Sequence, residues 1–397
     1  KHNSTAWVQR SIATAYGAPK KSATALSNPS TTSNIIILMH DYETDAEFLK
    51  RSNNNFFYFL WGPSNPPHIF ADMQQKTKPK GFYVVGPEEW EPVEVFPNTW
   101  EFYTFKEYAK NHNIDFAVFI GAIKDAKYNK RWHYNNEDNV HSFPTYFANV
   151  VINHAIDNNR KPLGHTNLEK LFTSMNGRAH PWRCRFIDYM YNADLFNHGN
   201  ISWHNLDEFD YNYQFKYWSP EKLNFDNEFT RPDGICDIFK PPQEFQTSLF
   251  SFISESNTNC LFYTEKTFLP ILNKRPFFIY GAPHANTYIK NLGFEIFDEI
   301  IDYTFDSVEN DTRRCQLYFE QASNLAKIPL DTLKNAVYSK VEHNFNRLLE
   351  IVENKEYIPK AFEKICKRNK DNMYIANYNR MINIGNSEQY KDWKSSI

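Results

Sequence analysis

Short apolar runs that stop abruptly at polar residues recur along this chain, and they restrict its fold more than any other feature. The run from Ile35 to His40 is β-branched and apolar, and it gives way at once to Asp41-Tyr42-Glu43. An unbroken apolar run of this length is typical of a strand buried on both faces, as in parallel sheets. Similar runs at 55–61, 81–85 and 115–120 are separated by helix-like or proline-rich stretches. This alternation predicts an α/β domain with a largely parallel sheet.

A second series of alternating segments follows a polar break at residues 158–164, and we place a domain boundary in that break. The pattern predicts strands at 170–175, 199–203, 248–254 and 276–281, helices at 181–191, 265–273 and 285–292, and a long amphipathic helical region over 312–352. The organisation we predict is a poorly ordered leader (1–33), an N-terminal Rossmann-like domain (34–163) and a C-terminal Rossmann-like domain with long C-terminal helices (164–397).

Length and composition agree with two domains and exclude several classes of protein. A chain of 397 residues can form two cores, and two domains imply a cleft between them. The formal net charge of −3 lacks the bulk positive field of a nucleic-acid binder, so nucleic acid is an unexpected partner. No apolar run approaches the ~20 residues that span a bilayer, and no signal peptide is recognisable. We therefore expect a cytoplasmic protein without a membrane partner.

The five cysteines are too widely spaced to suggest a structural role for their sulfur atoms. They are odd in number and form no CxxC or Cys/His cluster. This spacing predicts reduced, buried thiols rather than a disulfide framework or a zinc site.

An arginine-rich junction stands at the start of the second series. An apolar strand ends at a glycine-containing turn, Pro181 occupies the expected start of a helix, and three arginines crowd the turn: Arg178, Arg183 and Arg185. Free backbone N–H groups at a helix N-terminus, together with guanidinium groups, suit a phosphate or diphosphate. An arginine-rich surface turn without a ligand fits this stretch equally well, because the spacing of the usual glycine-rich phosphate loops is missing.

A second informative stretch lies at 250–281. Thr264 is a plausible N-cap, which places Glu265 and Lys266 in the first turn of a helix. There, a carboxylate can accept hydrogen bonds from a sugar diol, and an ammonium group can meet a phosphate. The competing interpretation is an ordinary capped helix in which Glu265 complements the helix dipole.

Together these two stretches resemble the donor domain of glycosyltransferases of the GT-B fold, in which two Rossmann-like domains face a cleft. The resemblance is to the α1,3-fucosyltransferase family and its divergent relatives in phages and large viruses. That family has Phe-Glu-Asn-Ser followed by Tyr-x-Thr-Glu-Lys. Here Glu255-Ser256-Asn257 precedes Thr264-Glu265-Lys266, with Glu265 ten positions after Glu255. The sequence departs from the family at 256 and 257, where Asn and Ser are exchanged, and at 261–263, where Leu-Phe-Tyr replaces Asp-Tyr.

The resemblance implies roles for individual donor-site residues. Glu265 would hold the ribose hydroxyls of a nucleotide sugar, and Lys266 would bind its diphosphate. Arg178, with Arg183 as the second choice, would bind the same diphosphate. Donor-site residues of the same motif are Glu255 and Tyr263. The resemblance further implies an inverting transferase with GDP-fucose as the leading donor and no other cofactor. The acceptor, bound by the N-terminal domain, would be a glycan, a glycoprotein or, for a phage enzyme, a modified base.

Two further expectations concern the chemistry. Preorganised cations can stabilise a leaving diphosphate without a metal, and neither Asp207–Asp210 nor Asp41–Glu43 contains Asp-x-Asp, so we predict metal-independent transfer. An inverting displacement needs a carboxylate that takes the acceptor proton. Asp41 and Glu43 follow a predicted strand, where open sheets bind ligands, although either also fits a solvated loop. Weaker rivals for this role are Glu88, Glu89 and Glu137.

Two other functions fit the same sequence. A non-catalytic carbohydrate-binding or structural protein could keep the fold and retain Glu265 and Lys266 as a helix cap. A sugar-phosphate enzyme such as an epimerase shares Rossmann-like architecture, but the missing glycine-rich dinucleotide fingerprint disfavours it.

Overall fold

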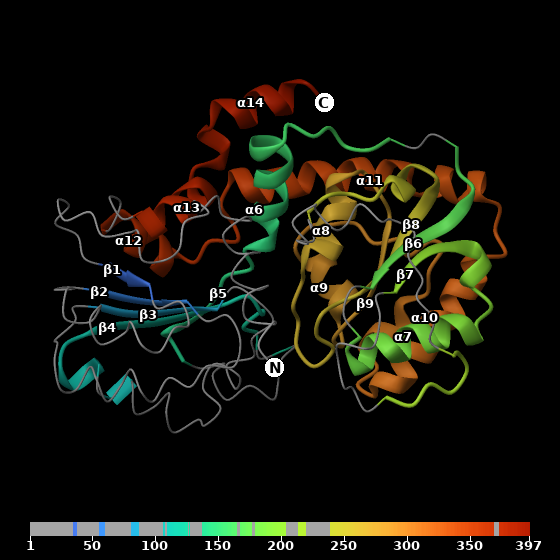
Figure 1. The fold of residues 1–397 in the computed structure, drawn as a ribbon, viewed down its shortest axis with the longest axis horizontal. Coiled ribbons are helices and arrows are strands. Elements are labelled where there is room, and N and C mark those ends of the chain that lie inside the picture. Colours follow the sequence, from blue (N-terminus) through green and yellow to red (C-terminus); the bar gives the residue numbers. More distant parts are fainter. Residues whose placement is uncertain are drawn as a thin grey trace. The chain divides into compact units, whose positions relative to one another are not determined.

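The computed structural model describes residues 35–37, 55–59, 81–86, 106–107, 109–125, 127, 137–164, 167–176, 179–203, 213–219, 239–368 and 373–397. The chain divides into two compact units, each with its own parallel sheet (Figure 1). Unit 1 comprises Lys1–Thr145 and Glu356–Asn383, and unit 2 comprises Tyr146–Lys355 and Ile384–Ile397. Two parallel α/β units are the organisation predicted for a GT-B-type chain.

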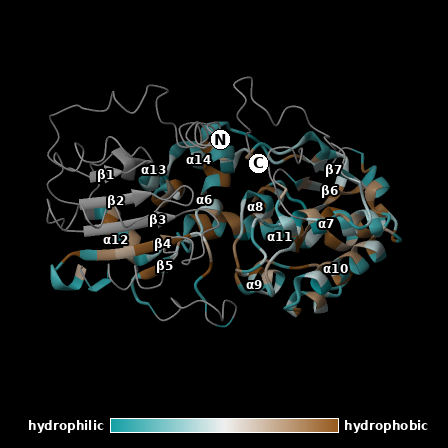
Figure 2. Cartoon of the chain, turned by 60° about the horizontal axis from the view of Figure 1, so that its bottom comes forward, coloured by the Kyte–Doolittle hydropathy of each residue, from teal (hydrophilic) through white to brown (hydrophobic). Residues whose placement is uncertain are grey.

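Unit 1 contains a five-stranded sheet whose strands lie in sequence order and pair in parallel. The strands are β1 (Ile35–Ile37), β2 (Asn55–Phe59), β3 (Gly81–Gly86), β4 (Asp115–Ile120) and β5 (Val140–Ser142). Four of these strands begin where the apolar runs begin. Figure 2 shows the hydrophobic colour of β4. Phe119 and Phe143 pack against Phe362 of α12 (Lys360–Arg368), and Phe143 also contacts Tyr378 of α13 (Met373–Ile382).

Unit 2 contains a four-stranded parallel sheet in the order β7-β6-β8-β9. Its strands are β6 (Lys170–Asn176), β7 (Gly199–Trp203), β8 (Ser248–Ser254) and β9 (Phe277–Tyr280). The strand order is not the sequence order, because β6 connects to β7 on one side whereas β8 connects to β9 on the other. The direction in which successive strands are added to the sheet therefore reverses between β6 and β8.

Helices cover both faces of this second sheet. Crossovers between parallel strands are right-handed, so α7 (Pro181–Asn192) and α8 (Glu265–Leu272), which lead in opposite directions along the sheet, lie on opposite faces. Phe186 of α7 contacts Tyr280, and Tyr318 of α10 (Asp311–Leu325) stacks on Phe278 with ring centroids 3.9 Å apart. Figure 1 shows α7 beside α10, and α9 (Ala285–Asn291) contacts β9.

The C-terminal part of unit 2 is helical and amphipathic, as predicted, but it is not one continuous helix. The chain leaves α10 after Leu325, and α11 (Leu330–Glu353) starts after Pro329. Proline has no N–H to donate and disfavours helical geometry in the residue before it, which explains the break. The apolar positions at helical spacing on α11 are buried, including Leu333, Val337 and Phe345. Hydrophilic and hydrophobic stripes alternate along α10 and α11 in Figure 2.

The units divide at a different place from the predicted boundary at 158–164. After β5 the chain enters α6 (Tyr146–Val151) and the π-helical turn Ile152–Asp157, and α6 packs against α8, where Phe147 and Phe268 approach with ring centroids 4.0 Å apart. These apolar contacts assign α6 to unit 2. The predicted C-terminal domain also included the last helices of the chain. Of these, α14 (Glu388–Ser395) belongs to unit 2, whereas α12 and α13 belong to unit 1. A polar break shows where a chain can form a loop. The boundary between two domains, however, depends on which hydrophobic core each segment packs against.

Two further expectations concern membrane spans and cysteines. Among the described residues, no helix is both long and apolar enough to cross a membrane. Four cysteines are buried free thiols, as predicted: Cys184, Cys260, Cys315 and Cys366. Burial raises the thiol pKa to about 12 for Cys184, Cys315 and Cys366, so these thiols stay protonated at neutral pH.

Candidate functional site

The direction change between β6 and β8 creates a topological switch point in the sheet of unit 2. In open α/β sheets, ligands bind in the crevice outside the carboxyl ends of the strands at such a point. Thr173 of β6 pairs with Ser251 of β8, so Asn176 and Ser254, each three residues further on, end these two strands together. The carboxyl ends of β6 and β8, with the helices that follow them, form the candidate site.

The last residues of the four strands form a row of side chains on one face of the sheet. The row runs across the paired positions Trp203, Asn176, Ser254 and Tyr280. Within the described part of the chain, three polar atoms of this row are buried and accept or donate no hydrogen bond: Trp203 Nε1, Asn176 Oδ1 and Ser254 Oγ. Buried polar atoms normally have a partner, and a ligand group or an ordered water can supply one. We refer to these four residues as the edge row.

The first turn of α8 is held in place by the residue that follows β8. Thr264 is the N-cap, and its Oγ1 accepts a hydrogen bond from the backbone N–H of Lys266 (3.2 Å). Glu255 is 1% exposed, and its carboxylate accepts from Thr264 N (3.2 Å), Thr264 Oγ1 (2.8 Å) and Thr267 Oγ1 (2.5 Å). Burial raises the pKa of Glu255, whereas the Lys266 ammonium and the threonine hydroxyls lower it. Glu255 therefore fixes the strand end to the helix start.

Glu265 and Lys266 lie together in this first turn, as predicted. Lys266 Nζ is 2.7 Å from Glu265 Oε1, and their side chains are 13% and 10% exposed. Each charge is thus compensated by the other in a poorly hydrated position. A ligand that presents hydroxyl groups to the carboxylate and phosphate oxygens to the ammonium would satisfy both groups without leaving a buried charge alone.

The start of α7 faces the same strand ends. Arg183, in the first turn of α7, is 2% exposed, and its Nη2 donates to Ser256 Oγ (3.1 Å). Trp182 Nε1 donates to the carbonyl of Glu255 (3.1 Å). No side chain of the described residues caps this helix, which has Pro181 at its first position. A buried guanidinium group beside an uncapped helix N-terminus is a suitable environment for an anion.

The third helix that follows a strand of this sheet is not open to an anion. Asp306 is 2% exposed, and its carboxylate accepts from Asn286 N (3.0 Å), Thr287 N (2.8 Å) and Thr287 Oγ1 (2.8 Å). These are the first N–H groups of α9, so a carboxylate of the protein already occupies that helix N-terminus. The anion-binding capacity of the sheet edge is concentrated at α7 and α8.

Arg314 of α10 ties together the loops around the site. It is 1% exposed, and its guanidinium donates to the carbonyls of Gly281 (3.0 Å), Val308 (2.6 Å), Glu309 (3.2 Å) and Thr258 (3.3 Å). It also pairs with Asp311 (2.8 Å). The loop after β8, the end of β9 and the start of α10 are therefore fixed relative to one another by one side chain.

A buried carboxylate on α7 anchors the aromatic segment 213–218. Asp188 is fully buried and accepts from the backbone N–H groups of Lys216 (2.9 Å), Tyr217 (2.8 Å) and Trp218 (2.9 Å), and from Tyr213 Oη (3.2 Å). Trp218 in turn packs edge-on against Trp203 of the edge row, with ring centroids 5.9 Å apart. These rings pack against one another next to the strand ends.

Replacing Asp188 with asparagine is expected to destabilise unit 2 by about 1–3 kcal/mol, because an amide NH₂ would face backbone donors that now share a carboxylate. Hydrogen exchange at the amides of Tyr217 and Trp218 should accelerate, and urea denaturation should show the loss. The same change at the exposed Asp194, where asparagine tolerates the φ of 55°, is the matched control and should stay within about 0.5 kcal/mol. Equal effects of the two substitutions would contradict the anchoring role of Asp188.

The structure brings four of the predicted site residues together: Arg183, Glu255, Glu265 and Lys266. Tyr263 belongs to the same segment but turns away from the strand ends, since its hydroxyl donates to the carbonyl of Ala285 (2.7 Å) in α9 and its side chain is buried. Its contacts are those of a packing residue.

Of the remaining predicted residues, only Glu137 is described by the structure. Asp41, Glu43, Glu88, Glu89 and Arg178 fall outside the described residues. The weaker candidate Glu137 lies in unit 1 and forms an ion pair with Lys106.

Sequence reasoning missed the edge row and the residues that fix α8. Asn176, Trp203 and Ser254 are unremarkable in sequence, and they meet only because β6 pairs with both β7 and β8. Thr267 could have been found from its position three residues after the N-cap Thr264, where a hydroxyl can reach the same acceptor. The part of the chain that the structure describes contains no group of three or more His, Cys, Asp or Glu placed to bind a metal.

Comparisons with known proteins give a likeness of fold. No family model matches the sequence, and no curated protein matches it. Among solved structures, a DNA-modifying β-glucosyltransferase studied with and without uridine diphosphoglucose is similar over 80% of this chain and 82% of its own, with 12% identity and a TM-score of 0.42. A mutant of the T4 phage enzyme BGT in complex with UDP-glucose covers 80% of this chain and 83% of its own, with 12% identity and a TM-score of 0.41. At this identity, the similarity assigns no residue a role.

Proposed function

We propose that this protein is a glycosyltransferase that moves a sugar from a nucleoside-diphosphate sugar to a hydroxyl acceptor. The observation that carries the proposal is the composition of the switch point between β6 and β8. Four features lie around the same strand ends. They are the buried edge-row atoms that lack a hydrogen-bond partner in the described chain, the buried Arg183, the Glu265–Lys266 pair and the uncapped start of α7. Such an edge can take one ligand that is anionic in one part and rich in hydroxyl groups in another.

Each part of the donor would meet a group of matching chemistry. The diphosphate would contact the Lys266 ammonium, the Arg183 guanidinium and the N–H groups at the start of α7. The ribose diol would donate to the Glu265 carboxylate, which its ion pair holds at the start of α8. Asn176 and Ser254 would supply the polar contacts deeper in the site. Glu255 would act through α8, as a positioning residue that holds Thr264 and Thr267.

The reaction that follows is an inverting displacement without a metal. The acceptor oxygen attacks the anomeric carbon as the bond from that carbon to the diphosphate oxygen breaks. The electron pair leaves on the diphosphate, where Lys266 and Arg183 stabilise the charge as it develops. The acceptor proton passes to a carboxylate, for which Asp41 and Glu43 remain the candidates because they follow β1. GDP-fucose remains our leading donor and a glycan or glycoprotein our leading acceptor, and the net charge of −3 weighs against DNA.

A thermal-shift screen against GDP, UDP, ADP and CMP, with and without EDTA, tests the donor site. A nucleotide at 100 times its dissociation constant should stabilise the folded protein by about 2.7 kcal/mol. Stabilisation by one nucleotide that persists in EDTA is the expected result. Transfer is then assayed with the corresponding nucleotide sugars on a glycan, a glycoprotein and duplex DNA.

Ser254→Ala is the sharpest variant for this screen. Removing a buried hydroxyl that lacks a partner should leave the free protein as stable or more stable by up to about 1 kcal/mol. Loss of one hydrogen bond to the ligand should weaken nucleotide-sugar binding by about 3- to 10-fold.

Ser251→Ala is the matched control for Ser254→Ala. Its hydroxyl is also buried without a partner in the described chain, on the same strand but outside the edge row, so nucleotide-sugar binding should be unchanged. Failure of every nucleotide to stabilise the protein would overturn the proposed function.

A non-catalytic carbohydrate-binding or structural protein is the alternative, and the Glu265–Lys266 contact supports it. A helix can begin with such a pair for its own stability, since a carboxylate in the first turn complements the helix dipole. This alternative predicts binding of free sugars or no ligand at all, with no stabilisation by nucleoside diphosphates.

A further inference from the structure

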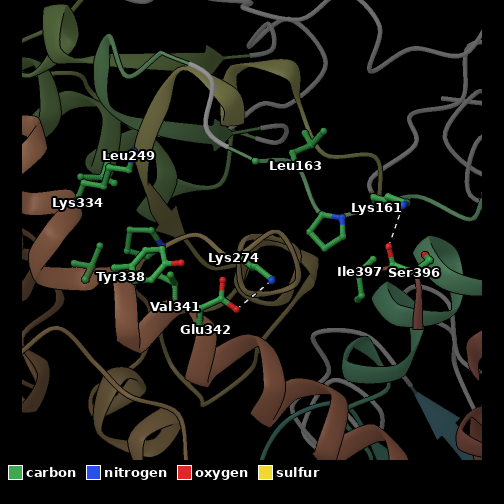
Figure 3. A pocket seen from close by; sticks show the side chains of 14 residues that line it. Lys161, Leu163, Leu249, Lys274, Lys334, Tyr338, Val341, Glu342, Ser396 and Ile397 are labelled. Carbon is green, nitrogen blue, oxygen red and sulfur yellow. Dashed lines mark hydrogen bonds and ion pairs between the residues drawn. The ribbon is translucent and has the colours of Figure 1, made fainter. Parts of the chain in front are cut away.

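A pocket near the amino ends of β8 and β9, at the other end of the strands from the candidate donor site, has no part in the proposed transfer reaction. Its volume is about 430 Å³, within the roughly 300–1,000 Å³ of small-molecule sites. It lies beside Leu249, near the start of β8, and Pro276, just before β9, whereas the candidate donor site lies at the strands' carboxyl ends. Figure 3 shows the side chains that line the pocket.

The walls of the pocket are largely aliphatic. Leu249 and Val337 are almost fully buried, and Leu163 and Val341 complete this surface. Tyr338 also lines the pocket and is 63% exposed. Of the three large hydrophobic side chains that are exposed in the described chain, two line this pocket, Tyr338 and Ile397. These two side chains add exposed apolar surface to the aliphatic walls of the pocket.

One face of α11 supplies both apolar and charged groups to the pocket. Lys334, Val337, Tyr338, Val341 and Glu342 follow the three- and four-residue spacing that places side chains on one side of a helix. The apolar positions of this face are thus flanked by charged groups that can reach a polar end of a ligand.

The charges around the pocket favour an anion. Three lysines line it, and only one acidic side chain does: Lys161, Lys274, Lys334 and Glu342. Glu342 is paired with Lys274 at 3.0 Å, which compensates both. Lys161 donates to the carbonyl of Ser396, whereas Lys334 has neither a hydrogen bond nor an ion pair within the described residues. In Figure 3, Lys161 and Lys334 lie on opposite sides, with the Lys274–Glu342 pair between them.

We propose that this pocket binds a small amphipathic anion, a molecule with an aliphatic chain and one carboxylate. The chain would lie against Leu249, Val337 and Val341, where it would leave water for an apolar surface. The carboxylate would meet Lys334, whose charge lacks a partner, at a half-buried position where attraction is less screened than on the open surface. An aliphatic chain matches these walls because aliphatic side chains form them.

Isothermal titration calorimetry with decanoate tests the proposal. Decanoate should bind the full chain at one site with a negative heat-capacity change, which is the signature of buried apolar surface. Decanol, which lacks the charge, and decylamine, which reverses it, should bind at least about tenfold more weakly. Absence of saturable decanoate binding, or equal binding of all three molecules, would overturn the proposal.

Two variants place the ligand in this pocket. Lys334→Glu should weaken decanoate binding by at least about tenfold, because an attractive charge becomes a repulsive one. Lys327→Glu makes the same change at an exposed lysine outside the pocket and should leave binding unchanged. Tyr338→Ala, at an exposed position where folding is not at risk, should weaken binding by removing apolar contact. Equal binding by Lys334→Glu and Lys327→Glu would show that decanoate binds elsewhere and would overturn the assignment.

Discussion

Replacing Lys266 with alanine is expected to lower kcat/KM for donor consumption by about 10²- to 10³-fold, the usual loss when one preorganised group at a developing charge is removed. The Lys266 side chain is 13% exposed, in the first turn of α8, where the helix dipole and the low hydration strengthen its interaction with an anionic leaving group. Hydrolysis of the nucleotide sugar identified by the thermal-shift screen provides the assay, because it requires no knowledge of the acceptor.

The helix start should survive this substitution, but the 10% exposed Glu265 loses its ion-pair partner, so the variant should be less stable and is assayed below its melting transition. The capping bond to Thr264 uses the backbone N–H of Lys266, and alanine is a good helix former. Lys290→Ala removes the same charge from an exposed position on α9. Among the described residues, Lys290 forms an ion pair with the surface residue Asp298, so the substitution should leave kcat/KM unchanged. If kcat/KM falls no further in Lys266→Ala than in Lys290→Ala, Lys266 does not stabilise the leaving group.

Replacing Arg314 with methionine is expected to destabilise unit 2 by about 3–5 kcal/mol, as when one partner of a buried ionic network is removed. Four carbonyl oxygens from three segments would lose their donor, and Asp311 would lose one of its cationic partners. Burial lowers the pKa of Arg314, because the charged guanidinium is removed from water. Urea denaturation followed by circular dichroism measures the loss.

The neighbouring residue provides a close control for Arg314. Arg313→Met removes the same charge one position earlier, where the guanidinium is exposed and contacts Gln316 and Glu320 on the surface, so its effect should stay within about 0.5 kcal/mol. Arg314→Lys should recover little of the lost stability, because an ammonium cannot reproduce the planar fork of donors. Similar midpoints for Arg313→Met and Arg314→Met would refute the anchoring role.

The strands were predictable because strands that are buried on both faces of a parallel sheet are predominantly apolar. The run at 115–120 became β4, and the run at 248–254 became β8, in which every residue is buried. Helices were predictable where capping chemistry accompanied the pattern, as with Thr264 before α8 and Pro181 at the start of α7. These signals are local, so they are readable without knowing the fold.

Predictions failed where the outcome depended on contacts between distant segments. The polar break at 158–164 does not separate the two units, because α6 already packs on α8 before the chain reaches it. The late helices α12 and α13 return to unit 1, where Phe362 and Tyr378 meet Phe143. No local pattern encodes which of two apolar surfaces a later helix will cover.

In the candidate site, too, local features were predictable from the sequence and long-range contacts were not. Glu265 and Lys266 could be singled out because their place in a helix's first turn is a local property, and the structure keeps them together. The role of Glu255 needed the structure, because its carboxylate fixes residues nine and twelve positions further along the chain. Tyr263 was grouped with the site because it belongs to the same motif, whereas its hydroxyl donates to the carbonyl of Ala285 in α9.

By itself, the sequence determined two series of apolar strands, the starts of several helices that follow them, and a charged pair at one helix start. These follow from the side-chain periodicity and backbone chemistry of adjacent residues. Only the tertiary structure decided that β8 lies next to β6. This pairing brought Asn176, Trp203 and Ser254 into one row and placed the starts of α7 and α8 at neighbouring strand ends. The physical reason is that strand order depends on which apolar surfaces pack best over the whole unit, and that free energy is shared among residues far apart in the chain.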